Sequence, residues 1–331
     1  MRLTDVRMEN LKLILDKMCR VKPGTHLLVF ADDYARSMTL AHDLMELANA
    51  MGAEAVMAVF KRRTHLAEEP PPSVAAAMKS AEVIVGVTEG PEIAHSTARK
   101  EATEAGVRRC VFVDPIDGED HLQKPITLKD LDLIKERSAR LCEIENKGKK
   151  VRLTTPHGTD LTFSIEGRPT ISLSPLAESP LVVAPFYAET AIAPVEGTTD
   201  GIIVIDSFVQ GWESMLRRPI RYEVKKGRAL VETVSSDIPG DAERFKKTLV
   251  MDKMANNCAA ELGIGTSHMI PGTPIGHVTD KARIGHVHIA VGRNYDLGGT
   301  SDSIIHQDGD MTQATITIDG VTIMENGVLK I

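Results

Sequence analysis

The first 150 residues alternate between short apolar runs and segments whose apolar residues recur at helical spacing, and this order most constrains the fold. The runs THLLVF, EAVMAVF, AEVIVGV and RRCVFVD indicate strands, whereas SMTLAHDLMELANAMGA has the period of a helix. Strands that alternate with helices predict a parallel sheet, because each crossover helix returns the chain to the same end of the sheet. We expect residues 1–148 to form a Rossmann-like α/β domain.

The first strand lacks the glycines of a nucleotide site. THLLVF is followed by ADDYAR, which has no glycine to let the backbone approach a pyrophosphate. We therefore expect the Rossmann-like fold without a dinucleotide.

The pattern changes after residue 148. Residues 128–146 have the character of a long charged helix with Thr127 as its N-cap, and KGKK after it indicates a solvated turn. Beyond it lie short strands and turns such as GIIVID and RYEVKKGRALVE. A chain of 331 residues with 42% hydrophobic residues can bury two cores. The sequence predicts a second, α+β and mainly β domain over residues 149–331, with a metal site.

Histidines and a carboxylate recur at strand spacing near the end of the chain. In IGHVHIAVG, His286 and His288 share one face of a strand, while the apolar residues between them point to the core. In SIIHQDGD, His306 and Asp308 likewise project together, about 7 Å apart at the backbone. The glycine-rich turn GRNYDLGGTSDS can bring these strands and Tyr295 together. The spacing favours a metal site over histidines that are merely hydrogen-bonded in the core.

Two glutamates lie in apolar surroundings. Glu189 occurs in PFYAETAIA and Glu261 in NCAAELGIG. A bare buried carboxylate is costly but becomes tolerable when it binds a cation. The alternative for each is an exposed strand end or a helix cap.

The second half of the chain resembles the aminopeptidase T family of metallo-aminopeptidases. The segments TTPHGTDLTFSIEGR, AETAIAPVEGTTDGIIVID, AAELGIGT, HIAVGRNYDLGGTSDSIIHQD and TITIDGVTIMENG occur in matching order, and RVKPGTHLLVFA fits more loosely. The resemblance implies Tyr295 as the catalytic tyrosine and a two-metal site whose ligands are Glu189, Glu261, His288, His306 and Asp308. Glu196, seven residues after Glu189 in the same loop, competes with it for that role.

The resemblance also implies a reaction. Two divalent ions would activate a bridging water for attack on a peptide or small amide bond, with Glu261 as proton shuttle and Tyr295 on the oxyanion. Three carboxylates and two dications leave a charge of about +1, which a bound hydroxide nearly neutralises. The four cysteines form no CxxC pair, and imidazole and carboxylate ligands suit zinc, cobalt or manganese.

A more distant resemblance gives a rival function. It is to 2,5-dihydroxypyridine 5,6-dioxygenase, which binds one Fe(II) through two histidines and an aspartate; His306 and Asp308 fit this pattern. Glu261 stands where that branch carries its other histidine, so we expect hydrolysis to prevail over oxygen chemistry. The short connection of residues 296–305 leaves the substrate open. A third alternative is a non-catalytic binding protein with the same fold.

Charge and the first residues exclude other classes. The net charge of -7 offers no basic surface for nucleic acid, and charges in every turn of the first 21 residues fit neither a signal peptide nor a membrane span. We expect a cytoplasmic homodimer or higher homo-oligomer that acts on a small molecule or short peptide. Residues 271–285 are expected to cover the site.

Overall fold

The computed structural model describes residues 5–64, 67–89, 93–113, 122–212, 214–270 and 272–331. The chain divides into two compact units: residues 1–135 with 173–187, and residues 136–172 with 188–331. These units differ from the expected domains, because the long helix is divided between them and residues 173–187 belong to the first unit. The two-domain organisation at residue 148 stays a prediction.

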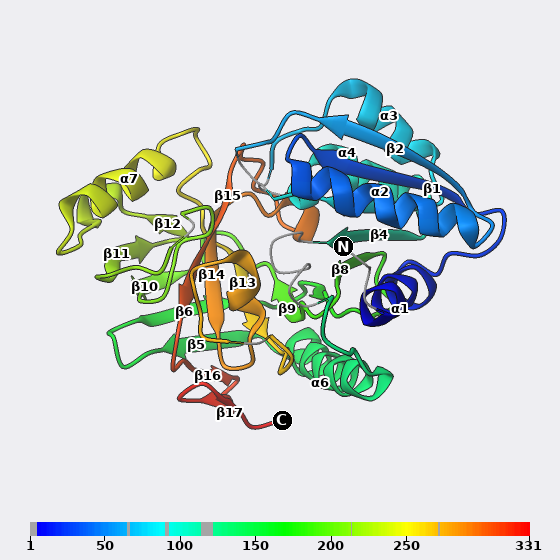
Figure 1. Ribbon diagram of the computed structural model, residues 1–331. Helices are drawn as coiled ribbons and strands as arrows, with labels where there is room; N and C mark the ends of the chain where they lie inside the picture. The colour runs from blue at the N-terminus through cyan, green and yellow to red at the C-terminus, as the bar shows by residue number, and fades with distance from the viewer. Residues whose placement is uncertain (1–4, 65–66, 90–92, 114–121, 213, 271) are drawn as a thin grey trace. The chain divides into compact units, whose positions relative to one another are not determined.

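The first unit contains a parallel sheet (Figure 1). Its strands, in spatial order, are β2 (Glu54–Phe60), β1 (His26–Asp32), β3 (Val83–Val87), β4 (Arg109–Val113) and β8 (Leu181–Ala184). Its helical segments are α1 (Asp5–Leu13), η1 (Ile14–Met18), α2 (Ala35–Ala50), α3 (Pro72–Ser80), η2 (Ile93–His95) and α4 (Thr97–Glu104). The four apolar runs of the sequence form β1 to β4, and β3 and β4 are buried along their whole length.

The second unit contains two antiparallel sheets. The larger one has the order β12 (Arg228–Ala229), β11 (Ile220–Lys225), β10 (Asp200–Ile205), β6 (Asp160–Ser164), β5 (Lys150–Thr154), β16 (Thr315–Ile318), β17 (Val321–Glu325) and β18 (Val328–Leu329). The smaller one has the order β15 (His306–Met311), β14 (Val287–Gly292), β13 (Cys258–Gly265), β9 (Glu189–Ile192) and β7 (Thr170–Ser172). The helical segments are η3 (Val231–Thr233), α7 (Pro239–Leu249), η4 (Val278–Ala282) and η5 (Tyr295–Leu297). The parallel and antiparallel sheets confirm the expected mixed α/β class.

The long helix α6 (Leu128–Lys147) agrees with its sequence prediction to within one residue. The hydroxyl of Thr127 accepts a hydrogen bond from the backbone N–H of Asp130 at 3.2 Å. This bond satisfies one of the amide groups left open in the first turn, as an N-cap does.

The core of the second unit lies between its two sheets. Val287, Ile289 and Val291 of β14 belong to one buried cluster with Ile203 and Ile205 of β10. The residues that alternate with them project to the opposite face of the smaller sheet. The alternation of IGHVHIAVG therefore predicted the core face of β14 correctly, and it leaves His288 on the other face.

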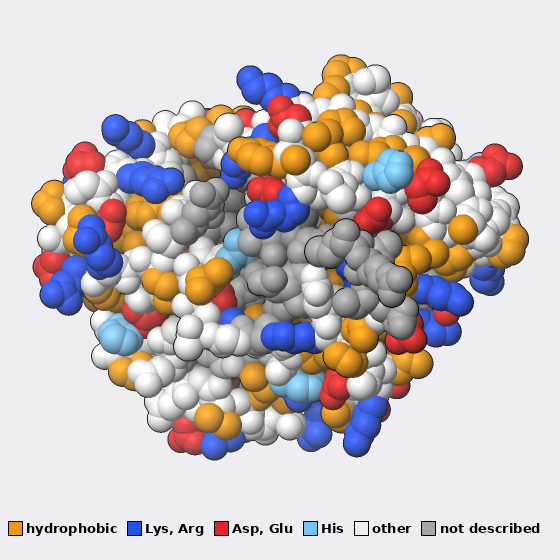
Figure 2. Space-filling model, viewed as in Figure 1, with side chains coloured by type: hydrophobic (Ala, Val, Ile, Leu, Met, Phe, Trp, Pro, Cys, Tyr) orange, Lys and Arg blue, Asp and Glu red, His pale blue; other side chains and the backbone are white. Residues whose placement is uncertain are grey.

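Two further observations concern the surface. On the face drawn in Figure 2, basic and acidic side chains of the described residues are interspersed. No helix in the described part of the chain combines the length and apolar character that crossing a membrane requires.

Candidate metal centre

Four strands of the smaller sheet bring the five predicted ligands together within the second unit. Cross-strand pairing places His288 beside Gly263 of β13 and Asp308 beside Ala290 of β14. All five side chains are at most 3% exposed: Glu189, Glu261, His288, His306 and Asp308. The sequence had singled out these five residues, although it left the burial of the two glutamates open. Their assignment as metal ligands is taken up under the proposed function.

Glu261 lies between the two imidazoles. Its Oε1 is 3.2 Å from His288 Nε2, and its Oε2 is 3.2 Å from His306 Nε2. His306 Nε2 is also 3.1 Å from Asp308 Oδ1, and His288 Nε2 is 4.0 Å from Asp308 Oδ2. On the other side of the ring, His288 Nδ1 is 3.8 Å from Glu189 Oε2. Ligand atoms of Glu189, Glu261 and His288 all lie within 4.8 Å of one another, which is close enough to share one ion.

The second nitrogen of His306 fixes its tautomer. Nδ1 lies 2.7 Å from the backbone carbonyl of Arg293 and must donate to it, because a carbonyl oxygen can only accept. In the neutral imidazole, the lone pair of Nε2 then points at the carboxylates of Glu261 and Asp308. That arrangement is repulsive unless a proton or a metal ion lies between them. Donation from the far nitrogen to a carbonyl is the usual support of a metal-binding histidine.

The charged groups of the cluster shift one another's pKa values toward the ionised forms. Burial alone raises the pKa of a carboxyl group, but hydrogen bonds and charges of His288 and His306 hold the pKa of Glu261 far below its ordinary value. Burial opposes ionisation of Asp308 too, and Lys281 and both imidazoles outweigh it and lower its pKa. Burial lowers the pKa of His306, whereas Asp308 and Glu261 raise it well above its ordinary value. A divalent cation would take over the role of the imidazole protons.

His288 requires a glycine opposite it. A Cβ atom at Gly263 would lie 1.9 Å from Cε1 and 2.1 Å from Nε2 of the His288 ring. Because His288 is fully buried, such a contact would force the ring or one of the two strands to shift. The ring occupies the space that any larger residue at position 263 would need.

Lys281 of η4 belongs to the cluster, and the sequence analysis missed it. It is 5% exposed, and its Nζ donates to Asp308 Oδ2 at 2.5 Å and lies 3.9 Å from Glu189 Oε1. Lys281 lies within residues 271–285, the segment that was expected to cover the site, and that covering role stays a prediction. No periodicity in HVTDKARIG marks the lysine, because its partners are distant in the sequence.

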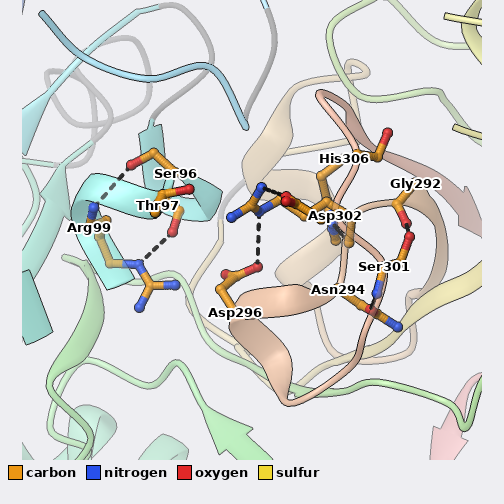
Figure 3. Close-up of polar contacts among 12 residues, drawn as sticks. Ser96, Thr97, Arg99, Gly292, Asn294, Asp296, Ser301, Asp302 and His306 are labelled. Atoms are coloured by element: carbon orange, nitrogen blue, oxygen red, sulfur yellow. Dashed lines mark hydrogen bonds and ion pairs between the residues drawn. The ribbon is translucent and has the colours of Figure 1, made fainter. Parts of the chain in front are cut away.

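The turn between β14 and β15 is held by a buried arginine. Arg293 is 4% exposed and pairs with Asp302 and, at 3.9 Å, with Asp296 (Figure 3). The hydroxyl of Ser301 donates to the carbonyl of Gly292 at 2.7 Å. Ser301 and Gly292 are labelled in Figure 3. The turn therefore holds the carbonyl of Arg293 in place for His306.

The structure separates Glu189 from its competitor. Glu196 pairs with Arg168 and accepts hydrogen bonds from Asn294 Nδ2 at 3.0 Å and from the backbone N–H of Thr300 at 2.7 Å. Glu196 fixes the turn before β15, whereas Glu189 is buried beside Glu261 and His288.

Two other candidates have different surroundings. Tyr295 is 42% exposed, and the guanidinium of Arg293 lies over its ring at 5.5 Å. His286 lies on the same face as His288, and its Nδ1 is 2.7 Å from Asp310 Oδ2. Tyr295 is thus partly exposed beside Arg293, and His286 has a carboxylate partner of its own.

The donor set fits a divalent metal ion. Imidazole nitrogens and carboxylate oxygens converge without thiolates, all buried, and the tautomer of His306 directs a lone pair to the carboxylates. Such a set suits iron, zinc, manganese or cobalt. Bound to it, an ion could polarise a substrate or activate a small molecule.

Comparison with solved structures establishes the fold. The structure of 2,5-dihydroxypyridine dioxygenase from Pseudomonas putida KT2440 matches with a TM-score of 0.77 and 16% identity, covering 99% of this chain and 96% of that one. Wild-type AmpT from Thermus thermophilus matches with a TM-score of 0.68 and 15% identity, covering 99% of this chain and all of the other. No curated protein matches the chain at a significant level.

Both resemblances noted in the sequence are thus confirmed at the level of fold. A family model described as NicX, 2,5-dihydroxypyridine 5,6-dioxygenase, matches residues 14–331. The chain belongs to this family.

Proposed function

We propose that the protein is a mononuclear non-haem Fe(II) dioxygenase that opens a small hydroxylated aromatic ring, such as a dihydroxypyridine. The family match over residues 14–331 carries this proposal. The buried cluster supports it with two imidazoles and a carboxylate, the ligand type of many non-haem iron oxygenases. It reverses the order of the sequence analysis, which ranked hydrolysis first.

His288, His306 and Asp308 would hold the iron, and Glu261 would be a fourth donor or a base beside it. Iron would supply the binding and activation of O2. Groups of the protein would position these ligands. The carbonyl of Arg293 keeps His306 Nε2 directed at the site, and Lys281 holds Asp308 in position. Glu261, 3.2 Å from both imidazoles, can accept a hydrogen bond from a ring hydroxyl as the substrate binds. Both atoms of O2 enter the product, so the reaction needs no external reductant.

Glu261 was the reason for favouring hydrolysis, because the dioxygenase branch carries a histidine there. The structure supports another source for the second imidazole, since His288 Nε2 and His306 Nε2 flank the same carboxylate. A ligand set of two histidines and one aspartate is therefore available with Glu261 in place.

The second candidate function is a two-metal aminopeptidase or related amidase. The fold shared with AmpT, together with Glu189 and Glu261 beside the histidines, favours it. Its ions would be zinc, cobalt or manganese, bound by Glu189, Glu261, His288, His306 and Asp308.

One protein preparation distinguishes the two functions. Metal-free protein is loaded with Fe(II) under nitrogen, and oxygen uptake is measured with a panel of dihydroxypyridines and dihydroxybenzoates. The same preparation with zinc, cobalt or manganese is tested on aminoacyl amides. Oxygen uptake that is lost in His306→Ala supports the dioxygenase. Amide hydrolysis without oxygen uptake would overturn it.

A further inference from the structure

A buried ammonium group stands among the candidate ligands of the metal centre. Lys281 Nζ lies 2.5 Å from Asp308 Oδ2 and 3.9 Å from Glu189 Oε1, and the residue is 5% exposed. We propose that Lys281 serves as the permanent second cation of this site, so that the cluster accepts one divalent ion and excludes a second. The inference deepens the proposed function and rests on its metal centre.

The cluster has two sides. On one side, both oxygens of Glu261, Nε2 of both histidines and Asp308 Oδ1 face one another at 3.1 to 3.2 Å. On the other side, Asp308 Oδ2 and Glu189 Oε1 face the ammonium. A second ion bound by both Asp308 Oδ2 and Glu189 Oε1 would compete with the ammonium for these same two oxygens.

The backbone holds Lys281 in that place. Its neighbour Asp280 accepts hydrogen bonds through Oδ2 from the backbone N–H groups of residues 275, 276 and 277 at 2.8 to 3.1 Å. Oδ1 of Asp280 accepts from Arg283 Nε at 2.8 Å. Ser267 donates its N–H to Ala282 and accepts from Ile284, which ties η4 to the end of β13. These bonds fix the backbone position from which the Lys281 side chain reaches Asp308.

The net charge of the buried cluster also favours one divalent ion over two. Glu189, Glu261 and Asp308 supply three negative charges, and Lys281 supplies one positive charge. One dication brings the sum to zero, whereas two would bury a net charge of +2. An uncompensated buried charge is strongly unfavourable. The sequence-based sum for two ions, about +1, omitted the lysine.

Metal counting tests the inference without a substrate. Metal-free protein is equilibrated with excess Mn2+ or Co2+, passed through a desalting column, and its metal content is measured by mass spectrometry. We expect one ion per chain for the wild type and two for Lys281→Met, which removes the charge but keeps the length. In the variant, two neighbouring Mn2+ ions should also weaken the six-line electron paramagnetic resonance signal through spin coupling.

Two controls accompany the variant. Lys246→Met makes the same change on the surface helix α7, where the lysine pairs with Glu243 at 2.8 Å, and should bind one ion. Glu189→Gln should retain one ion with less than a tenfold loss of affinity, because Glu189 faces the ammonium. Two ions per wild-type chain, or one ion in a folded Lys281→Met, overturns the inference. If Lys281→Met does not fold, the inference is tested with Glu189→Gln, and loss of the bound ion from that variant overturns the inference.

Failure of the inference and failure of the proposed function give different results. A wild-type protein with one ion and no oxygen uptake contradicts the dioxygenase but leaves the role of Lys281 intact. Oxygen uptake with two ions per chain contradicts the role of Lys281 alone.

Discussion

The two faces of the smaller sheet bury carboxyl groups in opposite states. Glu189 and Thr190 are successive residues of β9 and project to opposite sides. On the side of Glu189, Glu261 and Asp308 are held ionised by imidazoles and an ammonium. On the side of Thr190, burial raises the pKa of Glu145 in α6 to about 8, which the hydroxyl of Thr190 lowers only in part. Burial of a carboxyl group does not by itself mark a metal site, whereas burial among bases and a cation does.

The largest effect is expected from His306→Ala, which removes an imidazole that faces Glu261 and Asp308. Loss of an imidazole that faces two carboxylates should reduce bound metal to below a tenth of the wild-type level and oxygen uptake at least 100-fold. Metal analysis and an oxygen electrode measure both. His26→Ala, an exposed histidine paired with Glu54, is the control. Full metal content in His306→Ala would contradict the ligand assignment.

Glu145→Gln tests whether the buried carboxyl group on the Thr190 side of the sheet is protonated in the folded protein. The native state holds a proton on Glu145 up to about pH 8, and the unfolded chain releases it near 4.5. The native state therefore binds more protons in this window, so this group makes stability fall as pH rises from about 4.5 to about 8. The amide has the shape of the protonated acid and removes this loss.

Urea unfolding at pH 5 and pH 8 measures the effect of that substitution. The variant should gain stability over the wild type at pH 8 relative to pH 5, on the order of 3 kcal/mol. Glu143→Gln, on an exposed position of the same helix, should show no such difference. Equal pH dependence of wild type and Glu145→Gln would mean that Glu145 is ionised in the folded protein.

Glu196→Gln tests a partly exposed carboxylate, in contrast to the buried Glu261 and Glu145. Glu196 is partly exposed and holds the turn before β15 through Arg168, Asn294 and Thr300. The amide keeps one acceptor and loses the charge, so stability should fall by about 1 kcal/mol. Bound metal should stay at the wild-type level. A loss of metal in this variant would instead make Glu196 a ligand, as the sequence had left open.

Tyr295→Phe should have the smallest effect. Because Tyr295 is 42% exposed, loss of its hydroxyl should lower oxygen uptake less than threefold. Steady-state rates with the best substrate of the panel measure this. A 100-fold loss of an amidase activity would give Tyr295 the oxyanion role that the resemblance to aminopeptidase T implies.

The sequence predicted the elements whose pattern is local. Alternation in β14 and β15 identified His288, His306 and Asp308 and the apolar face opposite them, and the four apolar runs formed the parallel sheet. Thr127 correctly marked the start of α6.

The rest depended on contacts between distant residues. Strand β8 joins the parallel sheet from beyond residue 148 by pairing with β4, and nothing in LVVA indicates that partner. Lys281 lies in a segment with the composition of a solvated loop, and its burial follows from hydrogen bonds of Asp280 that no spacing shows. Glu189 and Glu196 have similar neighbours in the sequence, and only cross-strand pairing separates them.

The contact between Gly263 and the ring of His288 limits which residues related chains can carry at these two positions. A sequence that carries any side chain at the position of Gly263 has no room for an imidazole at that of His288. We therefore expect a related chain that lacks this glycine to lack the histidine as well.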